Sequence, residues 1–201
     1  MITVDCEQYS EEWWAARVGI PTASCFDQII TPTGKPSTQA KKYLHQLAGE
    51  RIAGCKTETY QSAAMQRGLE VEEEAWNFFN FVQNETAWQV GLCYPDDKKQ
   101  YSCSPDGLTE TAGLEIKCPL IHTHVEYLLS GTVPTKYIPQ IQGSMLVTGF
   151  PAWYFLSYYP GLPPLIIKVE RDTEYLAKLK VGLEMFIEEL EVTTERLRAM
   201  Q

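Results

Sequence analysis

The chain has 201 residues, of which 44% are hydrophobic and 21% charged, and its formal net charge is −9. These values are typical of a globular protein with a sizeable core, so we expect residues 1–201 to form one domain. No segment approaches the roughly 20 consecutive apolar residues of a membrane-spanning helix, and the N-terminus lacks the pattern of a secretory signal. We therefore expect a cytoplasmic protein without a membrane partner. The six cysteines form no CxxC pair, which favours reduced thiols over disulfides or a zinc site.

The negative net charge argues against a nucleic-acid partner, because neutralising phosphates requires Lys and Arg. Clustered carboxylates are also what a divalent cation requires, however, and a bound metal cancels part of their charge. The attraction of a polyanion depends on where the charges lie as well as on their sum. The composition therefore permits a DNA partner only at a locally basic or metal-loaded surface.

The periodicity of apolar residues predicts the elements in chain order. Helices are expected near residues 9–19, 24–30, 38–54 and 62–83, followed by strands near 86–94, 99–104 and 113–118. Helices near 121–130 and 135–148, strands near 152–159 and 164–170, and a long helix from about 173 to 199 complete the list. The polar segment 31–39 is expected to be a mobile loop. This order predicts an α/β fold in which helices flank a central mixed sheet.

The segment most informative about function is 102–119. Asp106 lies in a Pro-Asp-Gly turn, which places a carboxylate at the end of a strand. Apolar and polar residues alternate after it, so Glu115 and Lys117 are expected on one face of a strand and their neighbours in the core. A hairpin through residues 108–113 would bring Asp106 beside Glu115.

Two carboxylates and a lysine at one sheet end are the groups expected of a metal-dependent phosphodiesterase. Mg²⁺ prefers oxygen ligands, which Asp106, Glu115 and the backbone carbonyl of Ile116 would supply. Lys117 would orient the attacking water and stabilise developing charge, while the metal lowers the pKa of that water. The alternative is a turn aspartate beside an exposed Glu–Lys pair, which is the commoner origin of an isolated Glu-x-Lys pattern.

A carboxylate also interrupts the apolar face of the helix expected near 62–83. Glu72 fills a gap in a face formed by Met65, Leu69, Trp76 and Phe79. Burying a carboxylate is costly unless it is paired or bound to metal. Glu72 is therefore expected either to join the metal site or to lie at the edge of the face and pair with an arginine such as Arg67.

Several segments together resemble the phage lambda-type alkaline exonucleases, which are the YqaJ-like viral recombinases of the PD-(D/E)xK nuclease superfamily. The core of the resemblance is residues 104–108 (SPDGL) and 114–119 (LEIKCP). Four further segments match in family order: 13–24 (WWAARVGIPTAS), 68–75 (GLEVEEEA), 140–145 (QIQGSM) and 152–155 (AWYF).

The resemblance implies a restriction-endonuclease-like fold and a processive 5′→3′ exonuclease. Such an enzyme degrades one strand of linear double-stranded DNA to 5′-mononucleotides and leaves 3′ tails for phage recombination. The resemblance also implies two Mg²⁺ ions per site with Mn²⁺ as a substitute, a homotrimeric ring and a single-strand annealing protein as partner. A PD-(D/E)xK endonuclease of restriction or repair type is the alternative enzyme, and a non-catalytic DNA-binding module is the alternative class.

The resemblance assigns roles to particular residues as well. Asp106 and Glu115 match the metal ligands, Lys117 the catalytic lysine and Glu72 an additional acidic residue. Residues matching those that hold the 5′-terminal phosphate are Arg17, Ser24 and Ser104, a set whose guanidinium and hydroxyls suit an anion.

Five more residues are candidates with open alternatives. Gln140 and Gln142 lie in a motif that lines the site, and Gln140 is favoured because it shares a helix face with residues 137 and 144; ordinary surface amides are the alternative. Lys35 is the candidate for contact with a DNA groove. His122 and His124 are expected at the surface, because residues two apart on a helix do not share a face and so do not form a metal pair; contact with DNA is the alternative.

Overall fold

The computed structural model describes residues 1–57, 63–83 and 85–201, with the side chains of 63–65 and 69 left out. Its centre is a four-stranded sheet in the order β3-β4-β5-β6. The strands are β3 (Gly107–Leu108), β4 (Ala112–Lys117), β5 (Ala152–Ser157) and β6 (Leu165–Glu170). The β4–β5 pair is parallel and the other two pairs are antiparallel. The predicted α/β class with a mixed sheet flanked by helices is therefore confirmed.

Helices α3 (Ala63–Val82) and α5 (Ile138–Thr148) pack on opposite faces of this sheet. Phe79 of α3 packs with Leu114 and Leu156, whereas Met145 of α5 packs with Phe155. All six residues of β5 are buried because its alternate side chains meet different helices. Parallel pairing of β4 with β5 requires a crossover, which α4 (Ile121–Ser130), the 3₁₀ helix η2 (Thr135–Tyr137) and α5 supply.

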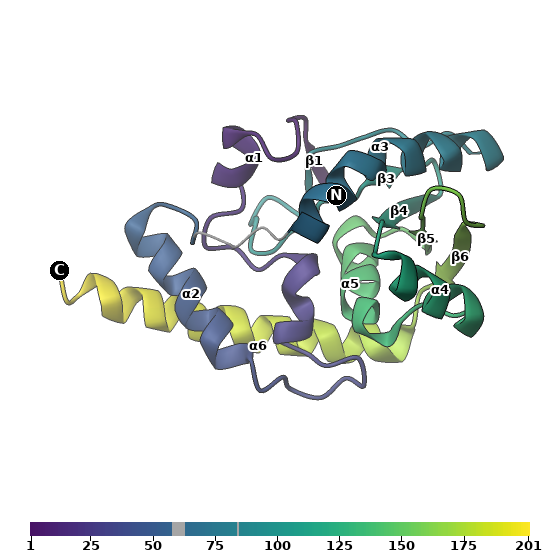
Figure 1. Ribbon diagram of the computed structural model, residues 1–201. Helices are drawn as coiled ribbons and strands as arrows, with labels where there is room; N and C mark the ends of the chain where they lie inside the picture. The colour runs from purple at the N-terminus through teal and green to yellow at the C-terminus, as the bar shows by residue number, and fades with distance from the viewer. Residues whose placement is uncertain (58–62, 84) are drawn as a thin grey trace.

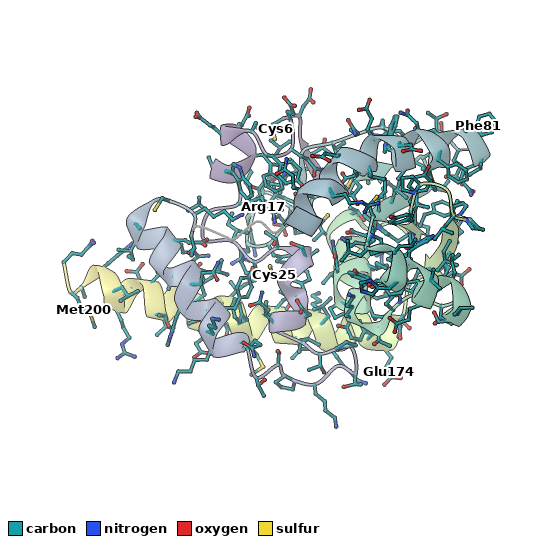
Figure 2. The ribbon with its side chains drawn as sticks, in the orientation of Figure 1. Cys6, Arg17, Cys25, Phe81, Glu174 and Met200 are labelled. Atoms are coloured by element: carbon teal, nitrogen blue, oxygen red, sulfur yellow. The ribbon has the colours of Figure 1, made fainter. Side chains whose placement is uncertain are left out.

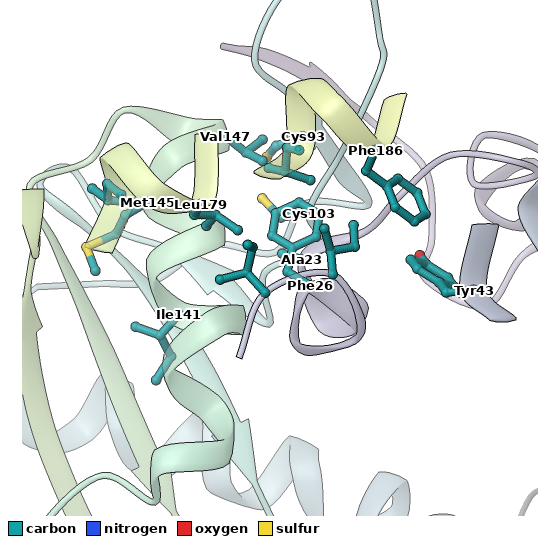
Figure 3. Packing of buried hydrophobic residues seen from close by; sticks show 14 of the residues in the cluster. Ala23, Phe26, Tyr43, Cys93, Cys103, Ile141, Met145, Val147, Leu179 and Phe186 are labelled. Atoms are coloured by element: carbon teal, nitrogen blue, oxygen red, sulfur yellow. The ribbon is translucent and has the colours of Figure 1, made fainter. Parts of the chain in front are cut away.

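A second helical layer packs against α5 (Figures 1 and 3). It contains α2 (Ala40–Ala53), the 3₁₀ helix η1 (Ala23–Gln28) and the long α6 (Thr173–Arg198). The apolar face predicted for the last helix is confirmed, since all its members are buried: Leu176, Leu179, Leu183, Phe186 and Leu190. The side chain of Asp172 caps α6 by accepting a hydrogen bond of 2.9 Å from the Tyr175 N–H.

The N-terminal region differs from the prediction. A short strand β1 (Ile2–Val4), which was not predicted, pairs antiparallel with β2 (Leu92–Tyr94). The helix expected near 9–19 is limited to α1 (Glu11–Ala15), and the next expected helix is the 3₁₀ helix η1. The turn that follows α1 contains Gly19, whose positive φ of 64° interrupts a helix.

Two further expectations about strands are wrong. The strand expected near 86–94 is confined to β2, and residues 99–104 form no strand, since Cys103 pairs with Cys93 only through an isolated bridge. The segment 31–39 is a loop, as expected, and an isolated bridge between Ile30 and Pro36 closes part of it. Within the described ranges no helix combines the length and apolarity required to cross a membrane.

Candidate active site

Strand β4 presents Glu115 and Lys117 on the same side of the sheet, as the alternation predicts. Leu114 and Ile116 point to the opposite side and belong to the core under α3. The ammonium group of Lys117 contacts Oε1 of Glu115. Only 2% of the Glu115 side chain is exposed and 26% of that of Lys117, so this is not the exposed ion pair of the alternative explanation.

The hairpin of β3 and β4 brings Asp106 beside β4. Gly107 pairs with Leu114, which confirms the predicted hairpin. The Asp106 N–H donates to the Leu114 carbonyl over 3.1 Å, and Asp106 Oδ2 accepts a hydrogen bond of 2.5 Å from the Ile116 N–H. Asp106 is thus fixed to the backbone on either side of Glu115.

The charges of this group act on one another. Burial and the negative charges of Glu115 and Glu72 raise the pKa of Asp106 well above its ordinary value. Burial also raises the pKa of Glu72; Lys117 opposes that rise and Glu115 adds to it. Burial would lower the pKa of Lys117, but Glu115 and Asp106 raise it above its ordinary value. Three carboxylates therefore share a single lysine at this point.

The donor set fits a hard cation. Oε2 of Glu115 is buried without a hydrogen-bond partner among the described residues, which leaves a carboxylate oxygen free to bind a ligand. Among the described residues, no three His, Cys, Asp or Glu side chains are already arranged to hold a metal ion together. Lys117 and Gln140 both contact Oε1 of Glu115 and so occupy part of the space beside this carboxylate.

Helix α5 contributes Gln140, whose Nε2 donates to Oε1 of Glu115 over 2.6 Å. The second glutamine of this motif, Gln142, makes different contacts. Nε2 of Gln142 donates to the Glu170 carbonyl over 2.9 Å, and its Oε1 accepts from the Asp172 N–H over 3.0 Å. Gln142 therefore joins α5 to the end of β6, whereas Gln140 faces the carboxylates.

Arg17 gathers hydroxyl groups from segments far apart in the sequence. Its Nη1 donates to Ser104 Oγ over 2.8 Å, and its Nη2 lies 3.3 Å from Thr22 Oγ1 and 3.5 Å from Ser24 Oγ. The guanidinium also lies 4.2 Å from the ring centroid of Trp13. Figure 2 shows Arg17 in the middle of the molecule. Burial lowers the pKa of Arg17, since the described residues hold no carboxylate in an ion pair with it.

Three of these residues, Arg17, Ser24 and Ser104, are predicted from the sequence, and two are not. Thr22 and Trp13 were not identified, and Nε1 of Trp13 also donates to Ser104 Oγ over 3.0 Å. The signal available for Trp13 was its place in the matched segment 13–24. A fork of guanidinium donors with three hydroxyls is suited to a phosphate group.

The arginine cluster and the carboxylates line one cavity of about 160 Å³. A second cavity of about 420 Å³ adjoins it, since both are lined by Gln8, Tyr9 and Asp106. Glu72 lines the second cavity. The described residues around the first are Gln8, Tyr9, Trp13, Arg17, Ala23, Ser24, Ser104, Asp106, Glu115, Lys117, Gln140 and Ser144. Tyr9 was also missed, because nothing in its local pattern marks it.

Other expectations fall outside this site. Lys35 is exposed in the loop after η1 and is not among the described residues that line either cavity. Arg67 does not pair with Glu72; its Nη1 donates to the Pro119 carbonyl over 3.3 Å. The side chains of Met65 and Leu69 lie outside the described residues, so the predicted face of α3 is seen only from residue 72 onward.

The expectation that both histidines lie at the surface is half wrong. His122 is exposed, but His124 is fully buried. Its ring nitrogens lie 2.8 Å from Ser157 Oγ and 2.9 Å from the Pro163 carbonyl oxygen. His124 is therefore a core residue that joins α4 to the end of β5 and the loop after it.

Comparison with known proteins finds relatives in both sequence and structure. The model of the YqaJ-like viral recombinase domain matches residues 12–151. The crystal structure of an alkaline exonuclease (LHK-Exo) from Laribacter hongkongensis is 33% identical with a TM-score of 0.86, covering 95% of this chain and 97% of that one.

Two more structures are similar. The complex of LHK-Exo with dAMP is 34% identical with a TM-score of 0.86, over 95% of this chain and 97% of that chain. A phage related exonuclease from Haemophilus somnus 129PT is 15% identical, with a TM-score of 0.65 over 90% and 96% of the two chains, and shows the fold alone. No curated protein matches the sequence. The chain belongs to the YqaJ-like viral recombinase domain family and has the restriction-endonuclease-like fold of its exonucleases.

Proposed function

We propose that the protein is a Mg²⁺-dependent exonuclease that degrades one strand of linear double-stranded DNA in the 5′→3′ direction and releases 5′-mononucleotides. One observation carries the proposal: the arginine–hydroxyl cluster and the carboxylate–lysine group line the same cavity. A terminal phosphate held by the cluster directs the first phosphodiester of its strand toward the hydrolytic residues. An enzyme that cuts within a chain has no need of a site for a terminal phosphate.

Arg17 and its hydroxyl partners bind the 5′-phosphate in this proposal. A guanidinium presents a planar fork of donors that matches phosphate oxygens, and Ser24 and Ser104 add hydroxyl donors. Arg17 already contacts both serines, so the site is largely preorganised. Lys35 remains a proposed contact with a more distant part of the duplex.

Asp106, Glu115 and Lys117 carry out the hydrolysis. Because neighbouring carboxylates raise the pKa of Lys117, its ammonium stays charged at alkaline pH and is able to hydrogen bond to the attacking water or a phosphoryl oxygen. Gln140 holds Oε1 of Glu115, which leaves Oε2 for a cation.

The proposed cation ligands are Asp106, Glu115 and the Ile116 carbonyl, with Glu72 as a further acidic group. Two Mg²⁺ ions per site, or two Mn²⁺ ions in their place, would act as Lewis acids and would lower the pKa of a bound water. The LHK-Exo complex with dAMP supports a nucleoside monophosphate as the product.

The remaining proposals follow from the family. They are processive action by a homotrimeric ring, a role in phage recombination in the cytoplasm of a bacterial host, and a single-strand annealing protein as the partner that binds the 3′ tail. The description of the family as viral recombinases supports a recombination role.

The test is digestion of defined DNA in Mg²⁺ and in EDTA. A linear duplex with one 5′-phosphorylated and one 5′-hydroxyl end should lose only the phosphorylated strand from its 5′ end, and mononucleotides should accumulate. EDTA should stop the reaction. Supercoiled circles should stay intact until linearised; cutting of circles as fast as linear DNA would identify the protein as an endonuclease instead.

A further inference from the structure

Tyr9 has an unusual backbone conformation beside the active site. It lies in a turn in which the Ser10 N–H donates to the Glu7 carbonyl over 3.2 Å, and its φ is +68°. A positive φ at the third position of such a turn favours glycine, because a side chain there is strained. Among the described residues only Tyr9 and Lys99 combine a side chain with a positive φ.

Neighbouring contacts hold this strained residue in place. Nε2 of Gln8 donates to the Pro105 carbonyl over 2.8 Å and to the Val90 carbonyl over 3.0 Å, which ties the turn to the segment before Asp106. On the other side, Ser10 caps α1 by accepting a hydrogen bond of 3.2 Å from the Trp13 N–H. A strained conformation fixed from both sides at a site points to a role for the side chain.

The ring of Tyr9 belongs to an aromatic cluster with cations above it. Its centroid lies 5.1 Å from that of Trp13 and 6.1 Å from that of Trp14. Arg17 lies over Trp13, and the ammonium of Lys56 lies 3.3 Å from the Trp14 ring centroid. Aromatic rings interleaved with cations are the usual components of surfaces that bind single nucleic-acid strands.

Tyr9 also stands between the two parts of the site. It lines both the cavity with the arginine cluster and the larger cavity with Glu72, yet 47% of it is exposed. An exposed ring at this position is open to a base on the strand that enters the cavity. Stacking on a ring tolerates any base, which suits an enzyme that degrades DNA of any sequence.

We propose that Tyr9 is a substrate-positioning residue whose ring stacks on the base of the 5′-terminal nucleotide while Arg17 holds its phosphate. This inference rests on the proposed exonuclease function. In this proposal the turn keeps a strained tyrosine because its aromatic ring is needed at the DNA end, where glycine would only reverse the chain.

The test compares enzyme variants on paired substrates. Linear duplexes carry a 5′-phosphate on either a normal or an abasic 5′-terminal nucleotide, and the rate of removal of that first nucleotide is measured at subsaturating DNA. For the wild type, loss of the base should lower kcat/KM about tenfold, a value within the range for one stacked base. Tyr9→Gly should lower the rate on normal ends by a similar factor and lose the difference between the substrates. Tyr9→Phe keeps the ring and should keep the difference.

Thermal stability separates this role from a structural one. Glycine relieves the positive φ but also removes the packing of the ring against Trp13 and Trp14, so Tyr9→Gly should remain folded with a Tm near that of the wild type while it lowers the rate on normal ends. Lys99→Gly is the matched control: it removes the other strained side chain, away from both cavities, and should raise the Tm but keep the wild-type base dependence. If Tyr9→Gly retains the wild-type dependence on the terminal base, the inference is overturned. If the wild type does not degrade linear DNA in Mg²⁺, the proposed function itself fails.

Discussion

Replacement of Arg17 by alanine tests the proposed phosphate site most directly. Two of its nitrogens already point at hydroxyl groups in the cavity, so a bound phosphate would gain two charge-assisted hydrogen bonds. Each such bond contributes about 1.5–3 kcal/mol, and the lower value is appropriate in a cavity open to water, giving about 3 kcal/mol in total. This corresponds to about a 100-fold preference for a 5′-phosphate over a 5′-hydroxyl end. Arg17→Ala should reduce that preference to near unity.

The assay compares kcat/KM for 5′-phosphorylated and 5′-hydroxyl duplexes with each variant. Because the preference is a ratio for one protein, it does not depend on the fraction of folded enzyme. Arg17→Lys should retain part of the preference, about tenfold, since an ammonium keeps the charge but lacks the planar fork. Arg67→Ala is the matched control, because Arg67 does not line the cavity, and it should behave as the wild type. A 100-fold preference that survives Arg17→Ala would refute the assignment.

Three further predictions concern Lys117, the carboxylates with raised pKa values, and the two histidines of α4. Lys117→Ala should lower hydrolysis at least about 100-fold while leaving the Mg²⁺-dependent rise in Tm; loss of that rise would make Lys117 part of cation binding. The pKa values of Asp106 and Glu72 are raised in the folded state, so without a cation the free energy of unfolding falls as pH rises through them. Mg²⁺ should therefore raise the Tm more at pH about 9 than at pH about 5, and equal shifts would contradict this reasoning. His124→Ala should lower the free energy of unfolding by about 2–4 kcal/mol in denaturant titrations, against less than about 0.5 kcal/mol for His122→Ala; equal losses would contradict the different burial of the two.

Predictions from local periodicity agree with the structure where one segment decides its own environment. The alternation around Glu115 and Lys117 follows from the pleat of any strand, and the apolar face of α6 from the pitch of any helix. The preference for Gln140 over Gln142 likewise follows from helical phase, and Gln140 contacts Glu115. These features require no knowledge of which element packs against which.

The failures occur where a distant segment decides the outcome. Residues 99–104 have the pattern of a strand, but a strand requires a partner along its length, and this segment forms only isolated bridges, from Ser102 to Thr22 and from Cys103 to Cys93. The sequence predicts that His124 lies at the surface, but the end of β5 and the loop at Pro163 enclose it. Neither partner is visible in the sequence around these residues.

The sequence by itself determined the α/β class, most element positions, the shared face of Glu115 and Lys117, and the family. Only the tertiary structure decided that Thr22 and Trp13 join Arg17, that Glu72 turns to the site instead of to Arg67, and that Tyr9 stands between two cavities in a strained turn. The physical reason is the range of the interactions. Faces of strands and helices are set by the backbone within a few residues, whereas a binding site is set by the packing of segments that only the complete fold brings together.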